Sequence, residues 1–360
     1  MRYWRNGIRA HRERMELPQF LPWQEASART WLAGRSQFAH AWLLHGLAGI
    51  GKQQFALAAA AALLCESPLN QLACGACSAC QWVAAGNHPD LRRIRPDAVA
   101  ALEGDDTDDE AAVATTKKSL SREIRVEQLR QLHDWFNTAT HRGGFRVAVL
   151  YPAESLNAIS ANALLKVLEE PPRNTVFLLV SDTPDRLLPT LISRCRRLPL
   201  SAPAPQEAEQ WLKQQGLAQP QHWLSAAGGA PLKALTLSQE SDTACPVWLR
   251  ALVTGLAQEN DADAGAVADE LEKLPATIWI DTLQRWWLDL MLSAQGVSPR
   301  YYPELDKLTR QVALRASAVN QSDLARWLVQ QKAVSTHPLN AKLLVQTALQ
   351  RVVLACRSAS

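Results

Sequence analysis

The sequence has no uninterrupted apolar run of about 20 residues, the length that a membrane-spanning helix requires. The first 14 residues are basic and contain no apolar core segment, so they match neither a secretory signal nor a membrane anchor. We therefore expect a cytoplasmic protein that makes no membrane contact. A more ordinary start follows at Met15, and we expect residues 1–16 to form a disordered N-terminal extension.

The chain also has little net charge. Its 38 Lys and Arg residues and 35 Asp and Glu residues leave a net charge of +3, which is too small to attract nucleic acid in bulk and permits only a local basic patch. Hydrophobic residues make up 47% and charged residues 20%, proportions that are typical of a globular protein. With 360 residues, the chain exceeds one ordinary domain, so we expect roughly two or three units.

A disulfide framework is not expected, because the seven cysteines are odd in number and unevenly spaced. Three of them, Cys195, Cys245 and Cys356, are scattered. The other four follow the spacing C-x8-C-x2-C-x2-C, and they are Cys65, Cys74, Cys77 and Cys80. Four thiolates that converge at about 2.3 Å from the metal are the usual ligands of structural zinc. The alternative is a set of buried free thiols, but Gly75 and Ser78 favour a turn. The pattern predicts a structural zinc site.

A glycine-rich turn stands just before the cysteines. Residues 46–52 satisfy G-x-x-x-x-G-K, between a predicted strand at 41–44 and a predicted helix at about 53–64. In such a turn the backbone N–H groups surround phosphate oxygens while the lysine neutralises their charge. The candidate nucleotide-binding residues are Gly46, Gly49, Gly51, Lys52 and Gln53.

Two parts of a hydrolytic site are missing around this turn. Gln53 follows the lysine where a Ser or Thr hydroxyl would help to hold Mg²⁺. The predicted strand at 147–150 leads into Tyr151-Pro152, where an Asp-Glu pair would be needed, and Glu154 would require an unusual turn to replace it. The turn would thus bind nucleotide weakly, bind it without hydrolysis, or serve only as a structural turn. No Ser/His/Asp, Cys/His or paired-carboxylate arrangement suggests another catalytic centre.

Strand and helix patterns alternate through the first 200 residues. Apolar strands at 146–150 and 175–180 flank a helical pattern at 158–170, and this alternation predicts a parallel, doubly wound α/β sheet over 17–200. An acidic stretch at about 97–120 lacks apolar periodicity and is expected to be a solvated insertion.

Strand signals end near residue 201. We expect a small helical domain at 201–242 and an all-helical domain at 243–360. Trp residues at helical spacing, including Trp279 and Trp286, would either fill the core of the second domain or form an oligomer contact.

Two further motifs carry a family resemblance. The stretches Asn162-Ala163-Leu164-Leu165-Lys166-Val167-Leu168-Glu169-Glu170-Pro171-Pro172 and Ile192-Ser193-Arg194-Cys195, with the four cysteines in the same order, resemble the AAA+ clamp-loader subunits of bacterial DNA polymerase III. The resemblance covers about 17–240. It implies an AAA+ P-loop-type parallel sheet with a zinc module at 65–80, a helical lid at 201–242 and an all-α oligomerisation collar at 243–360.

Within that family, the motor subunits gamma and tau keep both the Ser or Thr after the lysine and the Asp-Glu pair. This chain has neither, so it is similar to the delta-prime type, which need not hydrolyse ATP. The resemblance implies gamma/tau and delta subunits as partners, and contact with the sliding clamp and primed DNA through the complex. It also implies that Arg194 is an arginine finger directed at ATP on an adjacent motor subunit. Lys233 lies near the family's sensing arginine but does not match it.

Two other functions are open to test. The first alternative is an ATP-hydrolysing motor subunit of the gamma/tau type. The second is a zinc-dependent DNA-binding module, against which stands the absence of Lys and Arg between Cys65 and Cys80.

Overall fold

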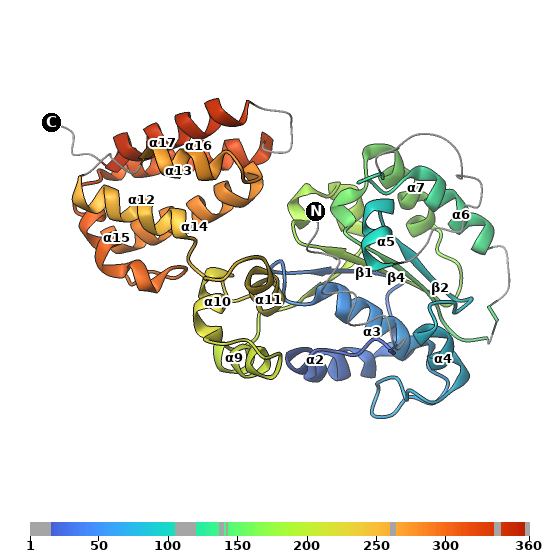
Figure 1. The fold of residues 1–360 in the computed structure, drawn as a ribbon. Coiled ribbons are helices and arrows are strands. Elements are labelled where there is room, and N and C mark those ends of the chain that lie inside the picture. Colours follow the sequence, from blue (N-terminus) through green and yellow to red (C-terminus); the bar gives the residue numbers. More distant parts are fainter. Residues whose placement is uncertain are drawn as a thin grey trace. The chain divides into compact units, whose positions relative to one another are not determined.

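The computed structural model describes residues 16–104, 120–136, 140–141, 143–259, 264–334 and 340–356. Nearly all of the expected N-terminal extension, and residues 105–119 of the expected acidic insertion, lie outside the described residues. The chain forms two compact units, Met1–Pro203 and Ala204–Ser360 (Figure 1). Within the described ranges, no helix has the length and apolarity required to span a bilayer.

The first unit is built on a five-stranded sheet in the order β2-β3-β4-β1-β5, with every neighbouring pair parallel. The strands are β1 (Ala41–His45), β2 (Leu91–Ile94), β3 (Arg146–Leu150), β4 (Thr175–Ser181) and β5 (Arg196–Pro199). All residues of β3 and β4 are buried, which explains their continuous apolar sequences because both faces of these strands are covered. The predicted parallel α/β sheet is confirmed.

Helices cover both faces of this sheet (Figure 1). The helices of this unit are α2 (Pro22–Ala33), α3 (Lys52–Leu64), α4 (Ser78–Ala84), α5 (Asp97–Glu103), α6 (Val126–Phe136), α7 (Ala158–Glu169) and α8 (Pro189–Arg194), with short 3-10 turns η1 (Arg35–Gln37), η2 (Ala153–Ser155) and η3 (Pro184–Arg186). Helix α3 packs against the sheet and against α2, so its Ala-rich sequence is buried almost throughout. On the opposite face, α6, α7 and α8 share a core with Leu43, Leu150 and Phe177.

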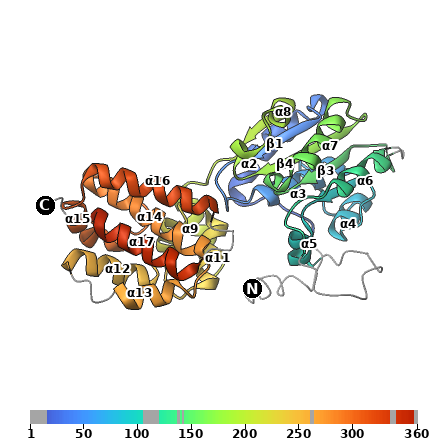
Figure 2. The same cartoon turned by 90° about the horizontal axis from the view of Figure 1, so that it is seen from above.

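All the regular secondary structure in the described part of the second unit is helical. Its elements are α9 (Pro205–Gln214), α10 (Pro220–Ala226), α11 (Pro231–Glu240), α12 (Val247–Gln258), α13 (Ala264–Leu271), α14 (Ala276–Ala294), η4 (Pro303–Leu305), α15 (Asp306–Ala313), α16 (Ala318–Val334) and α17 (Ala341–Cys356). A small core joins α9, α10 and α11, and a larger one surrounds α14. Helix α16 lies alongside both α14 and α17 (Figure 2).

The tryptophans of α14 belong to the core of this unit. Trp279, Trp286 and Trp287 are each no more than 1% exposed. Trp286 Nε1 donates to Thr309 Oγ1 at 3.2 Å, and Trp287 Nε1 donates to the Gln321 carbonyl at 2.9 Å. Because buried indole N–H groups need acceptors, these bonds fix both rings in place. The sequence left open whether such tryptophans fill the core or form an oligomer contact. These three residues fill the core.

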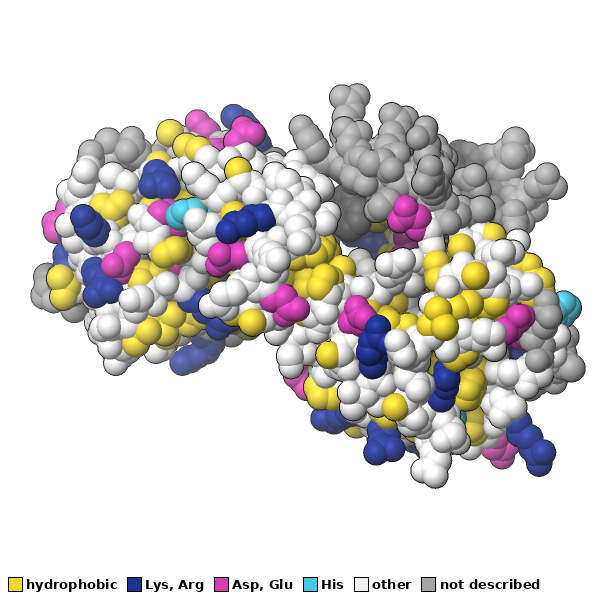
Figure 3. All heavy atoms as spheres, turned by 90° about the horizontal axis from the view of Figure 1, so that it is seen from below, with side chains coloured by type: hydrophobic (Ala, Val, Ile, Leu, Met, Phe, Trp, Pro, Cys, Tyr) yellow, Lys and Arg dark blue, Asp and Glu magenta, His cyan; other side chains and the backbone are white. Residues whose placement is uncertain are grey.

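The surface gives no sign of a broad charge field on the face drawn in Figure 3. There the described Lys and Arg side chains are interspersed with Asp and Glu rather than gathered into one area. This mixture agrees with the small net charge of the chain and offers nucleic acid no extended basic surface on that face.

Candidate functional sites

The glycine turn lies between β1 and α3, in the predicted order of strand, turn and helix. Gly49 and Gly51 have φ angles of 81° and 89°, in the left-handed region where glycine has no steric penalty. A Cβ atom on Gly51 would lie 2.2 Å from Leu21 Cδ1, and one on Gly46 would lie 2.2 Å from the Leu200 carbonyl oxygen. The glycines are therefore required by close packing against the turn as well as by its backbone.

The lysine of the turn is bound to its own chain. Lys52 is buried, and its Nζ donates to the carbonyl oxygens of Gly46 at 2.9 Å and Leu47 at 2.6 Å. It also forms an ion pair with Asp182, the residue after β4. The positive charge that would neutralise a phosphate is thus already opposed by a carboxylate.

The start of α2 occupies the other side of the turn. Trp23 Nε1 donates to the Ile50 carbonyl at 3.1 Å, and Gln24 Nε2 donates to the carbonyls of Ile50 and Gly51 at 3.0 and 2.8 Å. Gln24 is buried, so these bonds lie away from competing water. They hold the turn in a conformation stabilised by the protein itself.

The residues found in place of the hydrolytic groups converge on one carboxylate. Gln53 Nε2 donates to Glu103 Oε1 at 2.7 Å, and the Tyr151 hydroxyl donates to Glu103 Oε2 at 2.9 Å. Arg95 Nε pairs with the same Oε2 at 2.6 Å. Burial, followed by the charge of Glu103, raises the pKa of Tyr151, so its hydroxyl remains a donor at neutral pH. Glu103 ends α5, within the segment expected to be a solvated insertion.

Glu154 does not replace the missing acid pair. Its Oε1 accepts hydrogen bonds from Ser181 Oγ at 2.8 Å, from Thr183 N at 2.6 Å and Oγ1 at 3.1 Å, and from the backbone N–H of Asp182. These donors direct Glu154 to the turn after β4, where it holds the residue that pairs with Lys52. At this described position, the chain does not form the unusual turn that would bring Glu154 into the place of the Asp-Glu pair.

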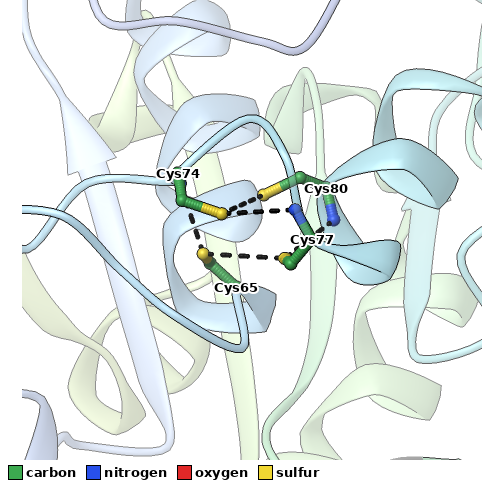
Figure 4. Close-up of side chains that lie close together, drawn as sticks. All are labelled: Cys65, Cys74, Cys77 and Cys80. Atoms are coloured by element: carbon green, nitrogen blue, oxygen red, sulfur yellow. Dashed lines mark hydrogen bonds between the residues drawn. The ribbon is translucent and has the colours of Figure 1, made fainter.

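The four cysteines meet at a single point (Figure 4). All four sulfur atoms lie within 4.8 Å of one another, and Cys65 Sγ to Cys77 Sγ and Cys74 Sγ to Cys80 Sγ both measure 3.9 Å. A tetrahedron of thiolates at about 2.3 Å from zinc places the sulfurs about 3.8 Å apart. The residues therefore fit a tetrahedral zinc ion, which would be held by all four of them.

Backbone N–H groups point at these sulfurs. Cys74 N donates to Cys65 Sγ at 3.3 Å, and the N–H groups of Ala76 and Cys77 donate to Cys74 Sγ at 3.5 and 3.4 Å. The N–H groups of Ala76 and Cys77 lower the pKa of Cys74 to about 6. Donors of this kind favour the thiolate, which is the form that binds a metal.

The cysteine cluster lies between the end of α3 and the start of α4, which are connected along the chain by a loop. Cys65 follows the last residue of α3, while Cys77 caps the start of α4 and accepts from Cys80 N at 3.5 Å. Arg29 of α2 donates to the Asn70 carbonyl at 2.6 Å, which ties the intervening loop to the rest of the unit. Metal at this cluster would fasten the end of α3 to α4.

Arg194 lies on the surface at the end of α8. Its Nη1 donates to the Thr190 carbonyl at 2.9 Å, and its Nη2 pairs with Glu169, the last residue of α7. The adjacent Cys195 is buried, and burial raises its pKa to about 12, so it remains a thiol. Among the described residues, the hydrogen bonds and ion pairs of Arg194 go to α7 and α8 and not to the glycine turn of its own chain.

Lys233 is engaged within the second unit. It lies in α11, and its Nζ pairs with Asp281 of α14 at 3.3 Å. Asp281 also pairs with Arg285 and, at 2.6 Å, with Lys332. Burial and the charge of Arg285 lower the pKa of Lys233. In this arrangement Lys233 serves an internal ion-pair cluster.

Several of these contacts were not foreseen from the sequence. They involve Gln24, Glu103, Glu169 and Asp182, each of which binds a group that lies between 25 and 130 residues away in the sequence. Among the local signals, only the glycines of the turn, Gly46 and Gly51, coincide with places where another segment packs closely. The structure brings together the four cysteines and, separately, the residues of the glycine turn.

A parallel sheet with a glycine turn after β1 and an α-helix immediately behind it defines a class of α/β proteins built on a phosphate-loop-type turn. A model of the family described as "DNA polymerase III, delta subunit" matches residues 31–204. DNA polymerase III subunit delta' of Pseudomonas aeruginosa is 33% identical over 341 residues, which cover 91% of this chain and 95% of that protein. The chain therefore belongs to the family of DNA polymerase III delta-prime subunits, and the predicted resemblance to the delta-prime type is confirmed.

A second DNA polymerase III subunit matches a smaller part of the chain. DNA polymerase III subunit tau of Escherichia coli is 34% identical over 163 residues, which cover 45% of this chain and 22% of that protein. Among solved structures, a gamma subunit-related protein of DNA polymerase III from Thermotoga maritima covers 92% of this chain with 14% identity and a TM-score of 0.45.

Proposed function

We propose that this chain is a delta-prime-type subunit of the DNA polymerase III clamp loader that does not itself hydrolyse ATP. Together with gamma/tau and delta subunits, it helps to load the sliding clamp onto primed DNA. Membership in the delta-prime family supports the role in the complex. The observation that carries the absence of hydrolysis is the internal occupation of the glycine turn, where Lys52 is bound by two carbonyl oxygens and Asp182.

Hydrolysis requires free groups at three places around the nucleotide. The lysine must reach the β- and γ-phosphates, a hydroxyl must help to hold Mg²⁺, and an acid must follow the neighbouring strand. Here the lysine is paired with Asp182, while Gln53 and Tyr151 both bind Glu103. ATP would have to displace these contacts and would still find neither the hydroxyl nor the acid. Binding of ATP to this turn is accordingly expected to be weak or absent.

The contribution of the chain to hydrolysis is proposed to act in trans through Arg194. A guanidinium has five N–H donors and keeps its charge at all physiological pH values, so it suits a phosphoryl group that gains charge in the transition state. The position of Arg194 supports this role, because its side chain is 34% exposed at the end of α8 and, among the described residues, makes no hydrogen bond or ion pair with its own glycine turn.

Zinc is proposed as a structural ion held by Cys65, Cys74, Cys77 and Cys80. The spacing of the sulfur atoms and the N–H groups directed at them support this assignment. A closed set of four thiolates leaves no open coordination position for water or substrate, so the ion would stabilise the fold and take no part in a reaction.

Two assays of ATP turnover test the proposal. The purified chain alone should show no Mg²⁺-dependent hydrolysis above that of Lys52→Ala. In the loader reconstituted with gamma/tau and delta, Arg194→Ala should leave the complex assembled and slow hydrolysis at the adjacent motor subunit by about 10³-fold or more. Turnover by the isolated chain that Lys52→Ala abolishes would instead identify a motor subunit of the gamma/tau type.

A further inference from the structure

Arg194 and Glu169 are held next to each other by the core beneath them. Leu168 precedes Glu169 and is 1% exposed, while Leu191 and Cys195 flank the last turn of α8 at 1% and 9% exposure. All three belong to one core cluster of the first unit. Since core side chains pack in fixed positions, the ends of α7 and α8 present the carboxylate and the guanidinium at one place on the surface.

The contacts of Arg194 use only part of its hydrogen-bonding capacity. Nη1 donates to the Thr190 carbonyl within α8, and Nη2 donates to Glu169 Oε1. A guanidinium carries five N–H donors, so about three remain for another acceptor. Both side chains are accessible, at 34% for Arg194 and 49% for Glu169. The arginine is therefore orientated by two bonds while the remaining donors stay available.

Glu169 contributes little to the stability of its own helix. It is the last residue of α7, where the helix dipole disfavours a negative charge. An ion pair as exposed as this one also contributes little to stability in water. Glu170, which follows, is likewise exposed but makes no ion pair among the described residues. What distinguishes Glu169 from Glu170 is its contact with Arg194, because Glu169 Oε1 accepts from Arg194 Nη2.

We propose that Glu169 is a positioning residue for Arg194. It limits the rotamers of the arginine before the subunits meet, so that the guanidinium is presented to the phosphates of ATP on the adjacent subunit. This inference rests on the proposed role of Arg194. An exposed pair of this strength yields readily to a phosphate, which carries more than one negative charge, so Glu169 would not retain the arginine against its target.

The test compares variants in the reconstituted loader, with assembly of the complex measured in parallel. Glu169→Ala should lower kcat for ATP by about three- to tenfold and leave KM nearly unchanged, because the lost interaction organises the transition state rather than the binding of ATP. Glu169→Gln, which keeps an acceptor for Nη2, should restore part of the rate. Glu170→Ala is the matched control and should behave as the unaltered chain.

A double variant separates positioning from a general structural effect. In Arg194→Ala, the additional change Glu169→Ala should cause no further loss, since the group that it positions is absent. An independent loss in the double variant would overturn the inference, as would equal rates for Glu169→Ala and Glu170→Ala when Arg194→Ala is slow. Full activity of Arg194→Ala would refute the proposed function of Arg194 itself, and the role of Glu169 with it.

Discussion

The glycine turn and the cysteine cluster lie at opposite ends of α3, and their binding groups are in opposite states. At the start of the helix, Lys52 and the carbonyl oxygens of the turn are bound to other residues of the chain. At its end, four sulfur atoms converge with backbone N–H groups behind them. Both sites carry a recognisable sequence motif, so the motif alone does not distinguish them.

This difference between the glycine turn and the cysteine cluster shows what keeps a motif able to bind a ligand. A motif marks where binding groups stand in the sequence, but only their partners in the fold decide whether those groups are free for a ligand. In the glycine turn, Lys52 Nζ has acceptors within the protein, and the carbonyl oxygens of Ile50 and Gly51 have donors, so these contacts stabilise the turn without nucleotide. The four sulfur atoms of the cysteine cluster, by contrast, lie as close together as the thiolates around a tetrahedral metal ion do. Of the two sites, the cysteine cluster is thus the one whose arrangement fits a ligand, namely a metal ion.

The largest expected effect is therefore loss of the metal. We predict one zinc ion per chain by elemental analysis. Cys77→Ser should abolish this content and lower the free energy of unfolding by several kcal/mol, because the binding free energy of a structural zinc ion is part of the folding free energy. Cys195→Ala, which removes a cysteine outside the cluster, should retain the full metal content. Zinc well below one equivalent in intact protein would contradict the assignment.

A smaller effect is expected from the charge that opposes the lysine of the turn. Asp182→Asn leaves the buried Lys52 without a carboxylate, and we predict a loss of about 1 to 2 kcal/mol in stability. Removal of one partner from a fully buried pair costs about 3 to 5 kcal/mol. Asp182, however, is 51% exposed, and Lys52 keeps its two carbonyl acceptors, so the loss should be smaller.

Chemical denaturation of the purified chain measures this effect. Asp185→Asn makes the same change of charge three residues further on, at an exposed position with no ion pair among the described residues, and should be neutral. With Lys52→Met in the background, Asp182→Asn should also become nearly neutral. If Asp182→Asn and Asp185→Asn have the same free energy of unfolding, the ion pair with Lys52 does not stabilise the turn. The turn would then not differ from the cysteine cluster in the way described above.

The two sites also differ in how far sequence could predict them. The cysteines lie within 16 residues of one another, so their spacing alone specifies a cluster that the fold then forms. The parallel sheet was equally predictable, because β3 and β4 are buried on both faces and read as continuous apolar runs. Local patterns suffice where the chain segments that interact are close together or uniformly buried.

The occupation of the glycine turn depends on contacts between distant segments. Asp182 is 130 residues from Lys52, and Glu103 is 50 residues from Gln53. Glu103 stands among acidic residues without apolar periodicity, which is the composition of a solvated loop, yet the end of α5 directs it toward Tyr151. Nothing local in the sequence marks one carboxylate of that stretch as a contact of the turn. Likewise, the pairing of Arg194 with Glu169 required the fold.

The smallest expected effect comes from restoring a single hydrolytic group. Gln53→Thr supplies the hydroxyl that a motor subunit has after the lysine, but we predict no Mg²⁺-dependent ATP turnover by the isolated chain. Lys52 would still be paired with Asp182, and Tyr151 would still occupy the place of the acid pair. The loss of the hydrogen bond to Glu103 Oε1, 2.7 Å long, should lower stability by about 1 kcal/mol. Turnover that appears in Gln53→Thr and disappears again in Gln53→Thr with Lys52→Ala would show that one hydroxyl was all the turn lacked. In that case the internal contacts of Lys52 would yield to ATP, and the turn would be as ready for its ligand as the cysteine cluster.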